Sequence, residues 1–226
     1  MVRPQEVYVW RTHVEAWRRS QWWAKFWSWL EEAEQRRHQR FATQQLQDRY
    51  LLSHALVRMA LSRLTGHHPA VWRYRKNPWG RPLIEEPAEW KGLFFSLSHS
   101  GDWAGCAAAL RQEVGYDLQR MASAETARRV SHRFFTREEA NAIANLAPEA
   151  AAEVFTRLWT RKEAYMKACG RGLSLPLRAA IPDRTWRIWS DPYHEGWETT
   201  MVRAAPNENW RLIRCELTPH DASLSW

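Results

Sequence analysis

Two stretches of the chain repeat apolar residues at the spacing of amphipathic helices. From residue 44 to 64, apolar side chains recur at positions 51/52, 55/56, 59/60 and 64, and Gly66 follows as a stop signal. From 149 to 168 they recur at 151, 155, 158 and 165, and Gly170 follows. We expect both stretches to be helices, and a tryptophan-rich stretch from about 20 to 33 to be helical as well.

Shorter runs have the alternation and the β-branched or aromatic content of strands. We expect strands at 7–11, 71–75 and 114–120. The segment 93–110 is predicted to form strand, turn and strand, with a polar turn of sequence Ser98-His-Ser-Gly. The run Asn77-Pro-Trp-Gly-Arg-Pro is a dense turn signal. The chain thus mixes helices and strands along most of its length.

The length of 226 residues allows one domain of that size or two small ones. A net charge of +8 indicates an acidic partner, which could be nucleic acid, an anionic membrane, a phosphorylated small molecule or an acidic protein. The lack of a block of consecutive Lys and Arg argues against nucleic acid. The start of the chain lacks a signal-peptide pattern and no long apolar run occurs, so we expect a cytoplasmic protein without a membrane partner.

The three cysteines are widely spaced, which predicts free thiols and no zinc site. Most of the sixteen tryptophans are expected to pack in the core.

The helix expected at 149–168 carries a candidate site. Trp159, Glu163 and Lys167 are four residues apart and Lys162 is adjacent, so a carboxylate is expected between two ammonium groups. An ordinary surface ion pair explains this spacing. A site that holds a divalent cation and phosphate together explains it as well, provided that other polar groups join it.

The strand expected at 114–120 supplies such a group. Asp117 and Gln119 point to the same face of that strand, and a buried aspartate is costly unless a cation or metal pairs with it. The Ser98-His99 turn offers a hydroxyl and an imidazole, which suit phosphate oxygens, although a histidine that caps a turn is an equal alternative. Arg49 and Arg81 could also bind an anion, but arginines exposed to solvent are the simpler interpretation.

Four motifs in this order resemble the 4′-phosphopantetheinyl transferases of the longer, monomeric Sfp type: Gly80-Arg-Pro, Ser98-His-Ser-Gly, Gly115-Tyr-Asp-Leu-Gln and Trp159-Thr-Arg-Lys-Glu-Ala-Tyr-Met-Lys. The resemblance runs from about residue 31 to 176. It implies an α+β fold of two similar halves in tandem, here residues 1–112 and 113–226, with the active site in the cleft between them. The tail beyond Ile181 is expected to complete the sheet and core of the second half.

The resemblance also implies an activity. Such an enzyme moves the 4′-phosphopantetheine arm of coenzyme A onto a serine of an acyl or peptidyl carrier protein, with Mg²⁺ as cofactor, and releases adenosine 3′,5′-bisphosphate. Asp117 and Glu163 match the family's acidic metal ligands, with Glu163 the suggested base. The residues expected to contact the coenzyme are Arg37, Arg49, Arg81, Pro82, Ser98, His99, Asp117, Lys162 and Lys167.

One residue departs from the family pattern. Gln119 stands where the family usually has a glutamate, so this metal ligand would be a neutral amide. A catalytically impaired relative that only binds coenzyme A or carrier protein therefore remains an alternative, and a nucleic-acid-binding module is a more distant one. The arginines between 120 and 137, with Met121, Phe134 and Phe135 among them, are the expected docking region for an acidic carrier.

Overall fold

The computed structural model describes residues 2–193, 196–204 and 208–220, and it has two halves, each with a sheet and a long helix. The elements of the first half are β1 (Glu6–His13), α1 (Val14–Arg18), α2 (Trp23–Trp29), α3 (Glu32–Gln39), α4 (Gln44–Thr65), η1 (Pro69–Val71), β2 (Arg73–Lys76), β3 (Pro82–Glu86), η2 (Ala88–Trp90), β4 (Leu93–Ser100) and β5 (Trp103–Leu110). Those that follow are β6 (Val114–Arg120), α5 (Ala124–Phe134), α6 (Arg137–Ala144), α7 (Pro148–Ala168), η3 (Gly172–Ser174), η4 (Leu177–Ala179), β7 (Trp186–Tyr193), β8 (Gly196–Arg203) and β9 (Arg211–Glu216).

The two strongest helical patterns are confirmed as α4 and α7, and Gly66 caps α4 as expected. The stretch at 20–33 is not one helix. Leu30 is extended, and Glu31 caps a new helix, α3, through a capping box with Glu34. The strand expected at 71–75 begins only at Arg73, since the preceding residues form the short helix η1.

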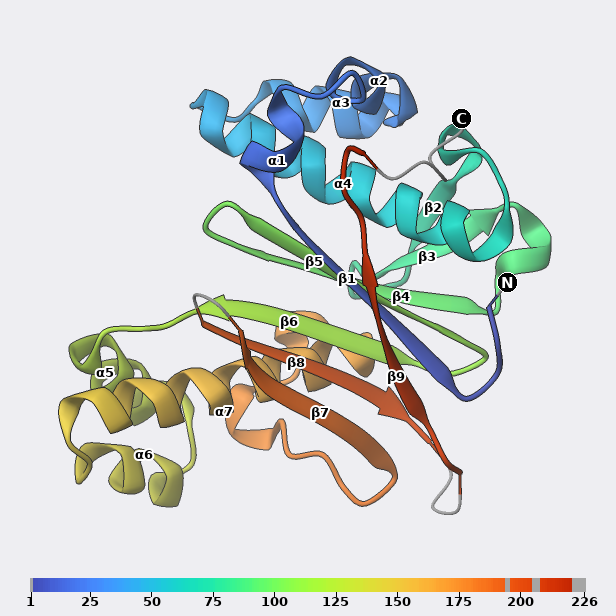
Figure 1. Ribbon diagram of the computed structural model, residues 1–226. Helices are drawn as coiled ribbons and strands as arrows, with labels where there is room; N and C mark the ends of the chain where they lie inside the picture. The colour runs from blue at the N-terminus through green and yellow to red at the C-terminus, as the bar shows by residue number, and fades with distance from the viewer. Residues whose placement is uncertain (1, 194–195, 205–207, 221–226) are drawn as a thin grey trace.

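The sheets show where the two halves meet. The first has the order β4-β5-β1-β9 and the second β6-β8-β7, while β2 and β3 form a separate hairpin. All neighbouring strands are antiparallel except β1 and β9, which are parallel. The tail was expected to complete the second half, and β7 and β8 do so. The expectation was wrong for β9, which crosses back and joins the sheet of the first half (Figure 1).

The two sheets pack face to face, with helices outside them (Figure 1). Helix α4 covers the first sheet, and the tryptophans there lie in the core as expected, with Trp10, Trp17 and Trp72 fully buried. Helix α7 packs directly on β6 and β8. None of the helices in the described part of the chain has the length and hydrophobicity to cross a membrane.

Three serines of β4 join the two halves along a seam. Ser96 Oγ accepts a hydrogen bond from the Tyr116 N–H at 3.0 Å, and Ser100 Oγ accepts one from the Arg120 N–H at 2.9 Å. Ser98 lies between them and donates to the Asp117 carboxylate. Because β6 is the edge of its sheet, these side chains satisfy backbone groups that would otherwise lack partners.

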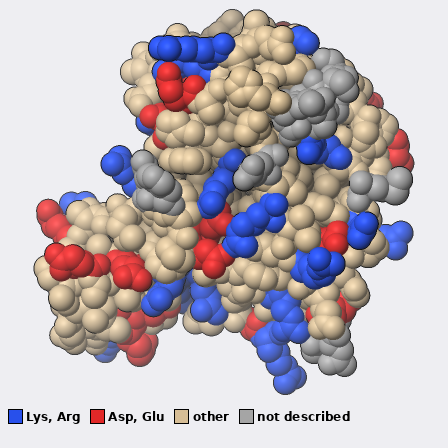
Figure 2. All heavy atoms as spheres, viewed as in Figure 1, with Lys and Arg blue, Asp and Glu red and all other residues tan. Residues whose placement is uncertain are grey.

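A second contact between the halves is centred on Glu198 of β8, which is buried. Its carboxylate pairs with Arg11 of β1 at 3.2 Å and with Arg214 of β9 at 3.5 Å, and it accepts a hydrogen bond from Tyr116 Oη at 3.2 Å. Figure 2 shows acidic and basic side chains meeting on this face, over β1, β8 and β9. The two halves are thus fixed to one another by both serine and ion-pair contacts.

Candidate active site at the seam

Asp117 is the centre of the candidate site. It is 4% exposed on β6, and its Oδ1 accepts hydrogen bonds from Ser98 Oγ and from Lys167 Nζ, both at 2.7 Å. Lys167 also donates to the Tyr116 carbonyl at 3.2 Å. The other carboxylate oxygen, Oδ2, is buried and has no hydrogen-bond partner among the described residues. A buried charged oxygen without a partner is unstable unless a cation reaches it.

Glu163 lies one helical turn before Lys167 on α7 and is half-buried. Burial raises the pKa of its carboxyl, the negative charge of Asp117 raises it further, and the positive charge of Lys167 opposes both. The two acids are therefore close enough to repel each other, as expected for groups that face one site.

No group of three or more His, Cys, Asp and Glu side chains in the described part of the chain is arranged to hold a metal. Two carboxylates with water are nevertheless a usual set for Mg²⁺, which keeps several of its waters in proteins. A divalent cation would pair with the unpartnered Oδ2 of Asp117 and would stabilise the negative charge of Glu163, so both residues fit such an ion. Gln119, two residues after Asp117, is partly buried on the same strand.

His99 lies at the rim of the site. Loss of solvent around the ring lowers its pKa, and the positive charges of Lys167 and Arg49 lower it further. The negative charge of Asp117 opposes these effects without reversing them, so the positive charges prevail around the ring. Arg49 itself pairs with Asp102 of the β4–β5 turn at 2.8 Å, a partner that the sequence did not suggest.

Lys162 does not join this group, so the expected carboxylate between two ammonium groups was wrong. Its Nζ is buried, pairs with Glu139 of α6 at 2.9 Å and donates to the Leu177 carbonyl at 3.2 Å. Adjacent helix positions point about 100° apart, so Lys162 faces α6 while Glu163 faces the seam. Trp159 also packs on that other side, against Phe135.

A pocket of about 470 Å³ opens beside the site. Rings and flat side chains line its walls, among them Tyr50, Tyr74, Phe95 and Pro82. Five Lys and Arg residues also line it, namely Arg37, Arg58, Lys76, Arg81 and Lys167. The structure therefore places Arg37, Arg81, Pro82 and Lys167 on one pocket, whereas Arg49, Ser98 and His99 are not among the residues that line it.

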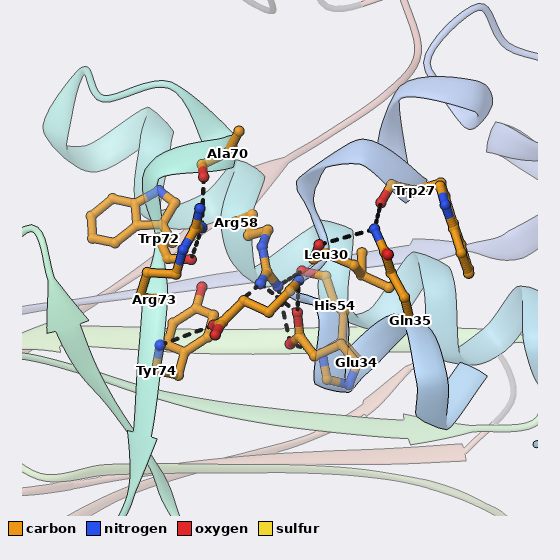
Figure 3. Close-up of polar contacts among 11 residues, drawn as sticks. Trp27, Leu30, Glu34, Gln35, His54, Arg58, Ala70, Trp72, Arg73 and Tyr74 are labelled. Atoms are coloured by element: carbon orange, nitrogen blue, oxygen red, sulfur yellow. Dashed lines mark hydrogen bonds and ion pairs between the residues drawn. The ribbon is translucent and has the colours of Figure 1, made fainter. Parts of the chain in front are cut away.

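The lining of this pocket also includes an ionic cluster that sequence reasoning missed. Glu34 pairs with Arg58 at 2.5 Å and with His54 Nδ1 at 2.6 Å, and Glu31 accepts from the Tyr74 N–H at 3.1 Å (Figure 3). Burial raises the pKa of Glu34, but the hydrogen bond with His54 and the charge of Arg58 prevail and lower it to about 2. Only the spacing of His54 and Arg58 on α4 hinted at a shared partner.

Two family models match the chain in tandem. The model described as 4′-phosphopantetheinyl transferase, N-terminal, covers residues 15–111. The model of the 4′-phosphopantetheinyl transferase superfamily covers residues 113–212.

Curated relatives agree with these matches. A putative 4′-phosphopantetheinyl transferase from Synechocystis sp. is 30% identical over 178 residues, which cover 72% of this chain and 72% of the relative. The transferase HetI from Nostoc sp. is 30% identical, over 61% of this chain and 58% of HetI. Sfp from Bacillus subtilis is 29% identical, over 68% of this chain and 66% of Sfp. The chain therefore belongs to the 4′-phosphopantetheinyl transferase superfamily, as an enzyme of its Sfp type.

Proposed function

We propose that the protein transfers the 4′-phosphopantetheine group of coenzyme A to a serine hydroxyl of an acidic acyl or peptidyl carrier protein and releases adenosine 3′,5′-bisphosphate. The observation that carries the proposal is the contact of Asp117 with Ser98 and Lys167, which joins the two halves beside a pocket of nucleotide size. Since both halves of the site come from one chain, a monomer suffices.

The pocket suits the nucleotide part of coenzyme A. Aromatic and proline side chains offer flat apolar surfaces for a base, and basic residues offer charge for phosphate groups. In this assignment Arg37 and Pro82 contact the nucleotide, and Ser98, His99, Arg49 and Lys167 contact phosphate oxygens. Arg49 would contact a phosphate oxygen while its guanidinium remains paired with Asp102.

Asp117 and Glu163 are the proposed ligands of Mg²⁺, with Gln119 contributing an amide oxygen directly or through water. When bound, the ion supplies positive charge that stabilises the pyrophosphate and the leaving phosphate. We propose the ion because it would pair with the unpartnered Oδ2 of Asp117 and would lower the raised pKa of Glu163.

The chain's own residues supply the remaining chemistry. Lys167 is held in place by Asp117 and the Tyr116 carbonyl, so its charge is oriented before reaction and can stabilise charge on the phosphoryl group. Glu163 is proposed to take the proton of the attacking serine hydroxyl, directly or through a metal-bound water, because it is the carboxylate expected near both the metal and the nucleophile. Positioning and charge neutralisation carry most of the catalysis in phosphoryl transfer.

The carrier is proposed to dock near α5. Met121 and Phe134 are exposed there beside several arginines, whereas Phe135 is buried against Phe155 and so cannot contribute, contrary to expectation. An acidic carrier would associate more slowly as salt is added. Association rates that do not change between low and high salt would exclude this electrostatic contribution.

The test is the intact mass of apo carrier proteins after incubation with the protein, coenzyme A and Mg²⁺. We expect one phosphopantetheine group to be added, and Glu163→Gln to lose most turnover while Glu153→Gln, an exposed residue of α7, retains it. Coenzyme binding without any carrier modification would instead support an impaired relative, the alternative that Gln119 motivates.

A further inference from the structure

The turn between β2 and β3 reaches across to the second half through Asn77 and Arg81. Nη1 of Arg81 donates to the Ala168 carbonyl at 2.8 Å, and Nη2 donates to the Val114 carbonyl at 3.2 Å. Nδ2 of Asn77 donates to the Gly170 carbonyl at 2.8 Å. We call these three hydrogen bonds the Arg81 clasp.

The clasp contacts the two elements that carry the acidic and basic site residues. Val114 begins β6, which carries Asp117, and Ala168 ends α7, which carries Glu163 and Lys167. The carbonyls in the last turn of a helix lack intrahelical partners and carry partial negative charge, so a guanidinium there satisfies and stabilises the helix end.

The turn is itself rigidly built for this contact. Oδ1 of Asn77 accepts from the backbone N–H groups of Trp79 and Arg81, both at 2.9 Å, so one side chain shapes the turn and binds the second half. Gly170 has a φ of +67°, and a Cβ there would lie 3.1 Å from Arg81 Cδ and 3.3 Å from Asn77 Nδ2. Glycine at this position therefore lets the clasp approach closely.

The Arg81 guanidinium uses two of its five N–H donors on backbone carbonyls of the second half. Both terminal nitrogens donate to carbonyls, Nε is buried without a partner among the described residues, and the group lies 5.6 Å above the Phe94 ring. The resemblance implied that Arg81 contacts the coenzyme. A lysine has all its donors on one nitrogen, so it lacks the planar fork with which Arg81 reaches the two carbonyls from separate nitrogens.

We infer that Arg81 is a positioning residue, which fixes α7 and β6 against the first half and thereby aligns Glu163, Lys167 and Asp117 with Ser98 and His99. The kinetic consequence rests on the proposed function. The structural consequence does not, because it concerns hydrogen bonds within the protein.

The experiment compares Arg81→Lys and Arg81→Ala with Arg75→Lys and Arg75→Ala, which change an exposed arginine of the neighbouring strand β2. Steady-state kinetics are measured with coenzyme A and with dephospho-coenzyme A, which lacks the 3′-phosphate. Amide hydrogen exchange of residues 165–172 and the melting temperature are measured on the same proteins.

We expect both Arg81 variants to lose about tenfold or more in kcat, because small misplacements of catalytic groups are costly. The KM for coenzyme A should change less than kcat, the loss should be the same for both coenzymes, and exchange at residues 165–172 should accelerate. The Arg75 variants should behave as wild type.

Two results would overturn the inference. The first is that Arg81→Lys has wild-type kinetics and that Arg81→Ala raises the KM for coenzyme A but not for dephospho-coenzyme A. This result would show that the side chain contacts the 3′-phosphate. A lower melting temperature with unchanged kinetics per folded molecule would show a structural role alone. If the wild type transfers nothing, the proposed function fails, and unchanged hydrogen exchange in the variants would then refute the clasp independently.

Discussion

Gly115 is the point at which α7 packs directly on the backbone of β6. A Cβ added there would lie 1.9 Å from the Ala164 carbonyl oxygen and 2.7 Å from the Ala168 nitrogen. Both are backbone atoms of a helix, so no side chain can turn aside to make room. Gly115→Ala should therefore displace the helix that carries Glu163 and Lys167.

The size of the displacement follows from the same contact. Ordinary van der Waals contact begins at 3.4 Å, so relieving a separation of 1.9 Å requires a movement of about 1.5 Å. Misplacing catalytic groups by roughly 1 Å can cost about a hundredfold in rate, and overpacking a core costs about 1–3 kcal/mol in stability. We expect turnover to fall by about a hundredfold and the melting temperature to fall as well.

The assay is carrier modification per folded molecule, with coenzyme A binding measured separately by calorimetry. Binding should weaken much less than turnover, because most of the pocket is built from the first half. Gly92→Ala is the matched control, since a Cβ there meets nothing within 4 Å. A Gly115→Ala protein with wild-type turnover would refute the claim that contact between α7 and β6 sets the site geometry.

Two further predictions concern residues outside the proposed chemistry. Lys162→Met should lower the free energy of unfolding by about 3 kcal/mol, because it leaves Glu139 without its buried partner. The KM for coenzyme A should not change. A raised KM would show that Lys162 contacts the coenzyme. The pKa of Glu34 is lowered from 4.5 to about 2, so its ionisation stabilises the fold above pH 4.5 by about 3 kcal/mol, and this contribution is lost as the pH falls towards 2. Denaturant titrations should show Glu34→Gln to be destabilised at pH 7 but not near pH 2, with Glu153→Gln unaffected; a pH-independent difference would contradict the ion-pair explanation.

The sequence predicted the elements whose signals are local. The apolar spacing of α4 and α7, the strand of Asp117 and the serine-rich β4 all depend on periodicity within one segment. Asp117 was expected to pair with a cation or a metal, because burying a lone carboxylate on a strand is costly. In the structure Lys167 pairs with it.

The other features of the fold and the site depend on contacts between distant segments, which no local sequence pattern indicates. Neither the crossing of β9 to the first sheet nor the pairing of Arg49 with Asp102 has a signal in either segment alone. Lys162 was misplaced because neighbouring helix positions face different partners, and only the position of α6 decides which. The resemblance predicted that Arg81 contacts the coenzyme, and only the coordinates show that its guanidinium donates to the Ala168 and Val114 carbonyls.

The proposed function requires Asp117 and Glu163 to share one divalent cation, and titration with Mn²⁺ measures that binding. Mn²⁺ accepts the same oxygen ligands as Mg²⁺, and its free concentration can be followed by electron paramagnetic resonance during titration of the protein with coenzyme A present. We predict one bound ion in the wild type, and at least about tenfold weaker binding in both Asp117→Asn and Glu163→Gln, because each removes a charged ligand. Wild-type affinity in either variant would contradict a shared site.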